Sequence, residues 1–178
     1  MSASLSAANE QDFEEICHLY EHVIAKVSGG PQDLIWDRAI HPSDSEIHAA
    51  IAQGSLLVMR EKEGPLLGAV VLDNKAANGY AQIPWEVQAQ DDQVGIIHLL
   101  AIEPALQGRG LGMQMMQLIA GRAKSLGWKA LRLDVLPNAT NARRLYTKAG
   151  FKELGIYKLS YTDPRVSKFV MYELELGE

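Results

Sequence analysis

A short glycine-rich segment, residues 107–112, is the part of the chain best suited to bind a charged ligand. It has glycine at positions 108, 110 and 112. An apolar run over 94–102 precedes it, and apolar residues at helical spacing follow it to about Ser125. Glycine has no Cβ, so the main chain can turn tightly and present several N–H groups, to which a following helix adds its unpaired donors. The stretch therefore predicts a phosphate-binding turn between a buried strand and a helix.

The spacing of these glycines differs from two common phosphate-binding loops. A dinucleotide-binding fingerprint would need glycine at Met113 after Gly108 and Gly110, and the Gly-Lys-Ser/Thr of a P-loop is absent. An NAD-dependent oxidoreductase or an NTPase is therefore disfavoured. The glycines could also serve only to make a tight turn, but a second motif further along the chain argues against that interpretation.

The second motif lies at the start of a predicted helix, where residues 138–146 read Asn-Ala-Thr-Asn-Ala-Arg-Arg-Leu-Tyr, followed by glycine and phenylalanine at 150 and 151. Together with this motif, the sequence Gln-Gly-Arg-Gly-Leu-Gly at 107–112 resembles the GNAT superfamily of acetyl-CoA-dependent N-acetyltransferases. The first motif matches the family's Gln/Arg-x-x-Gly-x-Gly pyrophosphate loop. The resemblance extends from about residue 13 to residue 176.

The resemblance implies that acetyl-CoA is the co-substrate, and it implies which residues bind it. Main-chain groups of Leu100, Ala101 and Ile102 would pair with the pantetheine arm as an added strand. Either Asn138 or Asn141 would contact the cofactor, and the other would cap the helix. The pyrophosphate would be held mainly by amides, with the Arg109 side chain either pairing with it or solvated. The loop residues concerned are Gln107, Gly108, Arg109, Gly110, Leu111, Gly112 and Met113.

Acetyl transfer to an amine needs a neutral nucleophile and a proton for the departing thiolate. A lysine-like amine costs about 4 to 5 kcal/mol to present in its neutral form at pH 7, so a base is useful. His98 in the apolar run and Glu86 beside Trp85 are the candidate bases. The position that serves as base in histone-type members is Ile96 here, which excludes that assignment. The resemblance implies that Tyr146 protonates the thiolate, although Tyr146 and His98 could instead be core residues.

We therefore expect an enzyme that transfers acetyl from acetyl-CoA to a primary amine, by direct attack in a ternary complex. The alternative is a non-catalytic acyl-CoA-binding regulatory module, which would keep the glycine-rich loop without depending on Tyr146. The amine acceptor, a small molecule or a peptide, is not encoded in any motif. The segments near Trp36 and over 80–85 are the candidate acceptor loops. The resemblance also allows a homodimer.

The remaining elements give the fold expected to position these residues. Loop 74–93 either binds substrate or covers the sheet with Tyr80 and Trp85 packed on the core. The strand, helix, strand order over 94–136 predicts a right-handed parallel crossover among otherwise antiparallel strands. We thus expect an α+β fold, an α/β/α sandwich with a mixed, mostly antiparallel sheet, whose parallel pair, by the resemblance, splays apart. The predicted helices span 13–27, 44–53, the end of the glycine-rich stretch to about 125, and 140–149; the predicted strands span 55–60, 66–72, 94–102, 129–136, 151–159 and 169–176.

Composition limits the remaining possibilities. A chain of 178 residues predicts a single domain over 1–178. The 17 basic and 22 acidic residues give a net charge of −5, so we expect no nucleic acid partner. No apolar run approaches the ~18 to 20 residues of a membrane helix, and no secretory signal is visible, so a cytoplasmic location is the expectation. Cys17 and the histidines form no convergent set, and we expect no metal.

Overall fold

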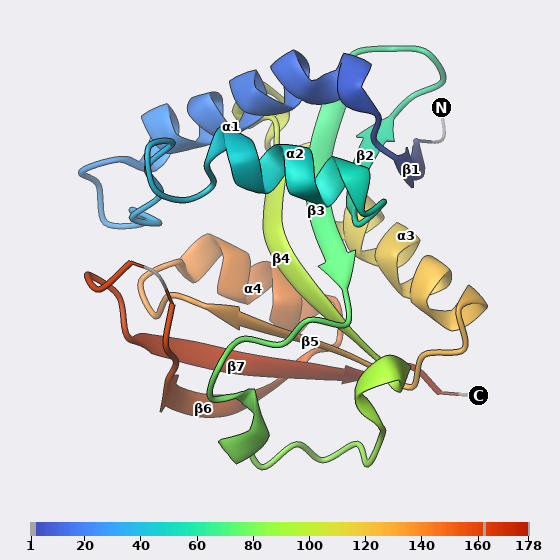
Figure 1. The fold of residues 1–178 in the computed structure, drawn as a ribbon, viewed down its shortest axis with the longest axis vertical. Coiled ribbons are helices and arrows are strands. Elements are labelled where there is room, and N and C mark those ends of the chain that lie inside the picture. Colours follow the sequence, from blue (N-terminus) through green and yellow to red (C-terminus); the bar gives the residue numbers. More distant parts are fainter. Residues whose placement is uncertain (1–2, 162, 178) are drawn as a thin grey trace.

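The computed structural model describes residues 3–161 and 163–177, and its centre is a seven-stranded sheet in the order β1-β2-β3-β4-β5-β7-β6 (Figure 1). Every neighbouring pair is antiparallel except β4 and β5, which are parallel. The predicted α+β class with a mixed, mostly antiparallel sheet is confirmed. The strands are β1 Ser4–Ala7, β2 Leu56–Arg60, β3 Leu66–Asp73, β4 Val94–Ile102, β5 Ala130–Val135, β6 Lys152–Lys158 and β7 Lys168–Glu175.

Helices cover both faces of the sheet, as the sandwich prediction requires. Figure 1 shows α1 and α2 together over one face, and α3 and α4 on the other. The α-helices are α1 Phe13–Val27, α2 Asp44–Ala52, α3 Leu111–Ser125 and α4 Thr140–Lys148; single 3-10 turns span Glu10–Asp12, Tyr80–Gln82, Asp91–Gln93 and Pro104–Leu106. In the ranges 3–161 and 163–177, no helix is long and apolar enough to cross a membrane.

Strand periodicity explains how one sheet buries two cores. In β2, Leu56 and Val58 pack under α1 and α2, whereas Leu57 and Met59 pack against the α3 side. Strands buried on both faces read as nearly continuous apolar runs, which is why these segments could be predicted as strands. A third cluster, around Phe169, lies where the connection from β3 to β4 covers the C-terminal half of the sheet.

The parallel pair is short, because β4 and β5 pair only from Val94–Ala130 to Ile96–Arg132. Beyond Ile96 the two strands diverge, as the predicted splay requires. On its other side, β4 carries a bulge opposite β3, and Leu99 in that bulge has a φ of 50°. The hydroxyl of Tyr20 in α1 donates to the carbonyl of Leu99 at 2.8 Å. The bulge and the divergence begin at the same place in the sheet.

The connection between β3 and β4 is fixed to the sheet by a buried ion pair. Arg132 of β5 and Glu173 of β7 are register partners, and the Arg132 Nε donates to Glu173 Oε2 at 2.8 Å. The other carboxylate oxygen of Glu173 accepts the amides of Glu86 and Val87, at 2.8 and 3.1 Å. The Arg132 guanidinium also lies over the Trp85 ring, 4.4 Å from its centroid. Of the two interpretations of this loop, the one that packs its aromatics on the core is therefore correct for Trp85.

We predict that Glu173→Ala lowers the free energy of unfolding by about 3 to 5 kcal/mol, because it leaves the Arg132 charge buried without a partner. Urea denaturation measures this loss. The control is Lys152→Ala, which removes an ion pair to Glu86 whose side chains are 63% and 55% exposed. We expect that change to cost about 0 to 1 kcal/mol. Equal effects of the two substitutions would contradict the role given to Glu173.

Candidate active site

The glycine-rich turn has the backbone geometry expected of an anion site. Gly108 and Gly110 have φ values of 84° and 77°, in the left-handed region that favours glycine, and Gly110 is the N-cap of α3. A Cβ built at either glycine would meet no atom within 4 Å, so there is open space beside the turn. Among the described residues, the amides of 108–113 make no hydrogen bond. Six consecutive free donors at a helix start fit a diphosphate.

The diverging strands enclose a cavity of about 310 Å³. Leu100 and Tyr146, both predicted site residues, line it, as does His98, whereas Ala101 and Ile102 do not. Its lining comes from β4, β5, β7, α2 and α4, and from the connections after α1, β5 and β6. The lining residues are Leu34, Ile35, Trp36, His41, Glu46, Ile97, His98, Leu99, Leu100, Asp134, Val135, Leu136, Ala142, Tyr146, Tyr161, Asp163, Val166 and Phe169.

Tyr146 reaches this cavity from α4 with its hydroxyl free. The residue is buried, and its ring packs against Phe151 and Tyr172 at centroid distances of 5.9 and 5.7 Å. In the part of the chain that the structure describes, no group forms a hydrogen bond with its hydroxyl. Burial raises the pKa of Tyr146, and the negative charge of Asp134 raises it further, so the phenol keeps its proton at neutral pH.

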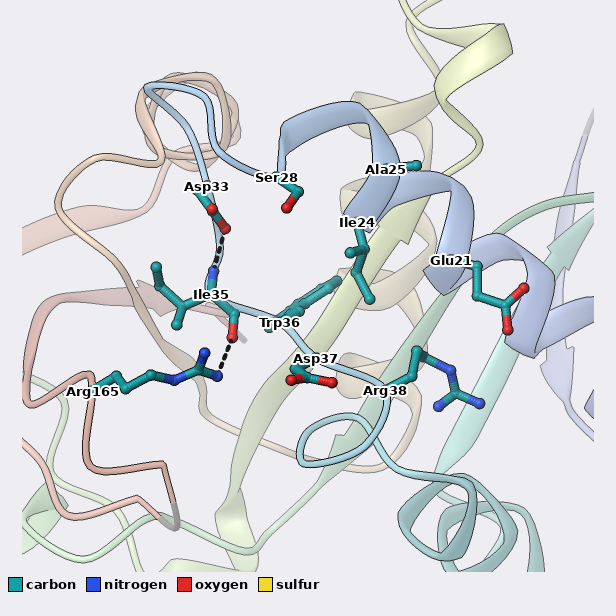
Figure 2. A pocket seen from close by; sticks show the side chains of 10 residues that line it. All are labelled: Glu21, Ile24, Ala25, Ser28, Asp33, Ile35, Trp36, Asp37, Arg38 and Arg165. Carbon is teal, nitrogen blue, oxygen red and sulfur yellow. Dashed lines mark hydrogen bonds between the residues drawn. The ribbon is translucent and has the colours of Figure 1, made fainter.

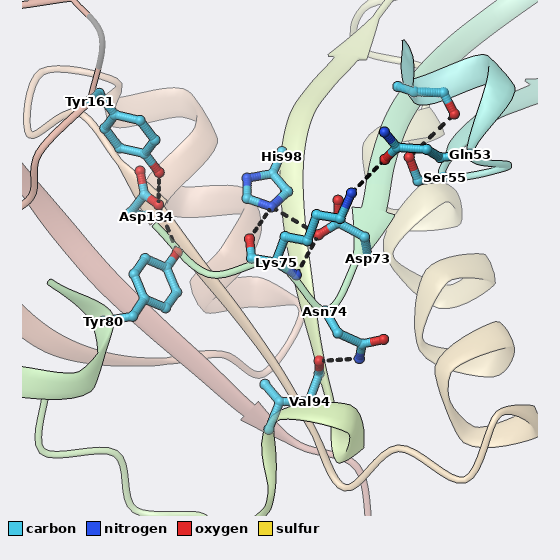
Figure 3. A network of polar contacts seen from close by, with 11 residues as sticks. Gln53, Ser55, Asp73, Asn74, Lys75, Tyr80, Val94, His98, Asp134 and Tyr161 are labelled. Atoms are coloured by element: carbon cyan, nitrogen blue, oxygen red, sulfur yellow. Dashed lines mark hydrogen bonds and ion pairs between the residues drawn. The ribbon is translucent and has the colours of Figure 1, made fainter. Parts of the chain in front are cut away.

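His98 points from β4 toward the same cavity and is held by one ring nitrogen. Its Nε2 lies 3.1 Å from the carbonyl oxygen of Lys75 and 3.3 Å from Asp73 Oδ1. A carbonyl only accepts, so Nε2 carries the proton and Nδ1 keeps a free lone pair in the neutral ring. In Figure 3, the second ring nitrogen lies on the side of Asp134 and Tyr161. Burial raises the pKa of Asp73, but the hydrogen bonds from His98 and the Lys75 amide outweigh it, and the net pKa is lowered.

Asp134, at the end of β5, is a site residue that the sequence reasoning missed. Its Oδ2 accepts the hydroxyls of Tyr80 and Tyr161, both at 2.6 Å (Figure 3). Burial raises the pKa of Asp134, and the two tyrosine hydrogen bonds oppose that rise without cancelling it. The two tyrosines are 54 and 27 residues away along the chain, so no local spacing signals this group.

Glu86, Asn138 and Asn141 also lie outside the cavity. Glu86 is exposed, and its side chain pairs with Lys152 at 2.5 Å. The Nδ2 of Asn138 donates to the carbonyls of Pro31 and Asp33, at 3.3 and 2.8 Å. The Asn141 side chain makes no hydrogen bond among the described residues, which leaves it free to contact a ligand. The expectation that one asparagine caps the helix is wrong, because the N-cap of α4 is Ala139 and the Asn141 amide in the first turn donates to the Gln32 side chain, at 2.8 Å.

A second cavity, of about 500 Å³, adjoins the first between α1 and the segment that follows it (Figure 2). Ile35 and Trp36 line both cavities. Ile35 has a φ of 58°, unusual for a β-branched residue. Figure 2 shows how it is held: its amide donates to Asp33 at 2.8 Å, and its carbonyl accepts from Arg165 at 3.3 Å. Of the predicted acceptor loops, the one near Trp36 therefore lines the cavities, and 80–85 does not.

The described residues contain no group of three or more His, Cys, Asp or Glu side chains able to hold a metal ion.

The Arg109 and Gln107 side chains are exposed. Within the described ranges, neither makes a side-chain hydrogen bond. The loop's geometry therefore comes from its main chain.

The model of the acetyltransferase (GNAT) family matches residues 28–151. Among curated protein sequences, none matches significantly. A GNAT-family acetyltransferase from Streptococcus agalactiae has a similar structure, with a TM-score of 0.79, 19% identity, and coverage of 99% of this chain and 96% of that one.

Two further solved structures share the fold. A phosphinothricin acetyltransferase from Sinorhizobium meliloti, in complex with acetyl-CoA, has a TM-score of 0.70 and 17% identity, with 99% and 90% of the two chains covered. The ribosomal-protein-S18-alanine N-acetyltransferase from Escherichia coli has a TM-score of 0.65 and 16% identity, with 99% and 95% covered. At these identities the likeness shows the fold alone.

We predict that Gly110→Val weakens coenzyme A binding roughly tenfold or more, because the left-handed conformation costs a β-branched residue about 1 to 3 kcal/mol and the turn must rearrange. Titration calorimetry with coenzyme A measures the change. The control is Gly121→Ala in the middle of α3, where a Cβ also meets no atom within 4 Å and φ is not positive. An unchanged affinity in Gly110→Val would contradict the assignment of this turn.

Proposed function

Because the chain belongs to the acetyltransferase (GNAT) family, whose members take the acetyl group from acetyl-CoA, we propose that it transfers this group to a primary amine by direct attack within a ternary complex. One observation carries the proposal. The gap between β4 and β5 holds a cavity lined by the unbonded Tyr146 hydroxyl and by His98, which keeps a free Nδ1. A proton donor and a proton acceptor thus line one space.

The donor half of the site would bind acetyl-CoA through the main chain. Amides of 108–113 would hold the pyrophosphate at the start of α3. Main-chain groups of Leu100, Ala101 and Ile102 would pair with the pantetheine arm on the side of β4 that faces the gap, where β5 no longer pairs. The free Asn141 side chain is the better candidate of the two asparagines, since Asn138 already holds the segment after α1. Acetyl-CoA supplies an electrophilic thioester carbon and a thiolate leaving group.

His98 and Tyr146 would then manage the protons. The acceptor ammonium gives one proton to His98 Nδ1, and its nitrogen forms the C–N bond to the acetyl carbon as the C–S bond breaks. Tyr146 gives its proton to the sulfur. The nitrogen loses a second proton, which returns to Tyr146 through solvent, so one proton is released overall. Asp73 would keep the His98 ring in the tautomer that accepts at Nδ1.

We predict that Tyr146→Phe lowers kcat roughly 100-fold while leaving the KM for acetyl-CoA within about threefold, since general acids contribute about 10²- to 10⁴-fold. Its stability should be close to that of the parent because the lost hydroxyl has no partner among the described residues. The control is Tyr172→Phe, which removes a hydroxyl that donates to Glu153 at 2.9 Å, outside the cavity lining. An unchanged kcat in Tyr146→Phe would remove the acid role.

We predict that His98→Gln lowers kcat/KM about 10- to 100-fold, because the amide side chain cannot accept the proton that the imidazole Nδ1 would take. The rate is measured by thiol release from acetyl-CoA. The control is His22→Gln on the exposed face of α1, where Nδ1 lies 3.0 Å from Glu103. A kcat/KM in His98→Gln equal to that of the parent would leave Asp134 as the next candidate base.

Thiol release from acetyl-CoA with a broad panel of amines tests the whole proposal. Steady release that depends on the amine supports the transferase. Tight coenzyme A binding without release for any amine would favour the regulatory module instead, because such a module needs the turn at 108–113 but not Tyr146.

A further inference from the structure

The lining of the 310 Å³ cavity is rich in acidic side chains. Three carboxylates line it, from Glu46, Asp134 and Asp163, whereas its lining includes no lysine or arginine. Two of the three already have a basic partner. His41 Nδ1 lies 3.1 Å from Glu46 Oε1, and the Arg165 Nε donates to both oxygens of Asp163 at 2.9 Å.

Asp134 is the carboxylate that has no basic partner within ion-pair distance among the described residues. The hydroxyls of Tyr80 and Tyr161 both donate to its Oδ2, and these 2.6 Å contacts have the length of hydrogen bonds to an ionised oxygen. Its Oδ1 accepts none within the described ranges. Within residues 3–161 and 163–177, Arg38 Nε is the fully buried side-chain atom that lacks a hydrogen-bond partner. The unbonded Oδ1 of Asp134 is therefore not fully buried, and Asp134 lines the cavity.

The position of Asp134 in the sheet places it on the acceptor side. Strand alternation puts Leu133 and Val135 toward α3 and α4, the side from which Tyr146 reaches the gap, and therefore puts Asp134 on the opposite face. His98 shares that opposite face, because its neighbour Ile97 packs on the α3 side. The carboxylate and the candidate base thus face one space, with Tyr146 across the gap.

An unpaired carboxylate in an apolar enclosure is costly, and a ligand cation removes that cost. The lining of the same cavity includes Trp36, Val166 and Phe169, and aromatic faces add attraction for a cation. A carboxylate or phosphate on the ligand would instead meet three carboxylates and no lysine or arginine from the lining.

We propose, resting on the transferase function above, that Asp134 binds the acceptor as an ammonium ion, and that the acceptor is a primary amine on an apolar group without an acidic substituent. Tyr80 and Tyr161 position the carboxylate by holding one of its oxygens, and the other oxygen receives the ammonium. His98, from β4, is a further titratable side chain on this face, and His41, from the segment after α1, also lines the cavity.

Measuring the affinity of the free protein for small amines tests the proposed ammonium site without requiring turnover. The probes are 2-phenylethylamine and 2-phenylethanol, which have the same shape and differ in charge, measured by calorimetry on the full chain at pH 7. We expect the amine to bind at least tenfold more tightly, and we expect phenylalanine, which adds a carboxylate, to bind at least tenfold more weakly than the amine. Equal affinity for amine and alcohol would overturn the proposal without any variant.

Variants then assign the preference to one residue. Asp134→Asn should bring the amine-to-alcohol ratio to within about twofold of unity. The control Glu46→Gln removes another lining carboxylate, while the replacement can still accept the Ser43 amide, and it should keep the preference. A folded Asp134→Asn protein that keeps the full preference, or an equal loss in both variants, would contradict the assignment. Thermal unfolding checks the fold.

Thiol release with the same probes separates the two proposals. Release with phenylalanine or other amino acids, but not with 2-phenylethylamine, would leave the transferase intact and overturn the acceptor class. Preferential binding of 2-phenylethylamine without release would support the role of Asp134 and count against acetyl transfer.

Discussion

The three-residue parallel pairing between β4 and β5 is the constraint from which the rest of the site follows. Strands that stayed paired would satisfy each other's main-chain groups and leave no room between them. Here the pairing ends at Ile96 and Arg132, and a bulge at Leu99 begins where it ends. Backbone groups on the open side of β4 need other partners, since unpaired buried main-chain groups are rare. A ligand that behaves as a strand fits that need.

The divergence of β4 and β5 also places the side chains of the site on the two faces of the sheet. Side chains alternate along each strand, so the gap has the Tyr146 hydroxyl on the α4 side and His98 and Asp134 on the other. The start of α3, with its free amides, lies at the end of β4 that leads away from the pairing. The proposed donor and acceptor would therefore enter from opposite sides and meet in the gap.

Much of this arrangement was predictable because the signals are local. The turn at 107–112 depends on glycines whose positive φ values follow from adjacent residues, and the buried strands are continuous apolar runs. The four-residue edge strand β1 was not predicted, since most of its side chains are exposed and it has no apolar run. Element types were recoverable wherever the pattern extended over several residues.

Sequence analysis missed or misplaced the other residues because their positions depend on contacts between segments that are far apart in the chain. The position of Glu86 depends on its amide reaching Glu173, 87 residues away, and that anchor directs its side chain to Lys152 instead of the cavity. Asp134 matters only because Tyr80 and Tyr161 reach it. Whether Asn138 or Asn141 is free depends on where the segment after α1 comes to rest. The spacing of residues along the chain does not predict such long-range contacts.

The outer wall of the cavity has a consequence for how such proteins diverge. Ile35 and Trp36 belong to no helix or strand, and Ile35 is held in its unusual conformation by two side chains, those of Asp33 and Arg165. Residues on this wall can therefore be exchanged without changing the pairing of the strands or the turn at 108–113. Under the proposed function, the choice of acceptor would thus be separable from the binding of acetyl-CoA.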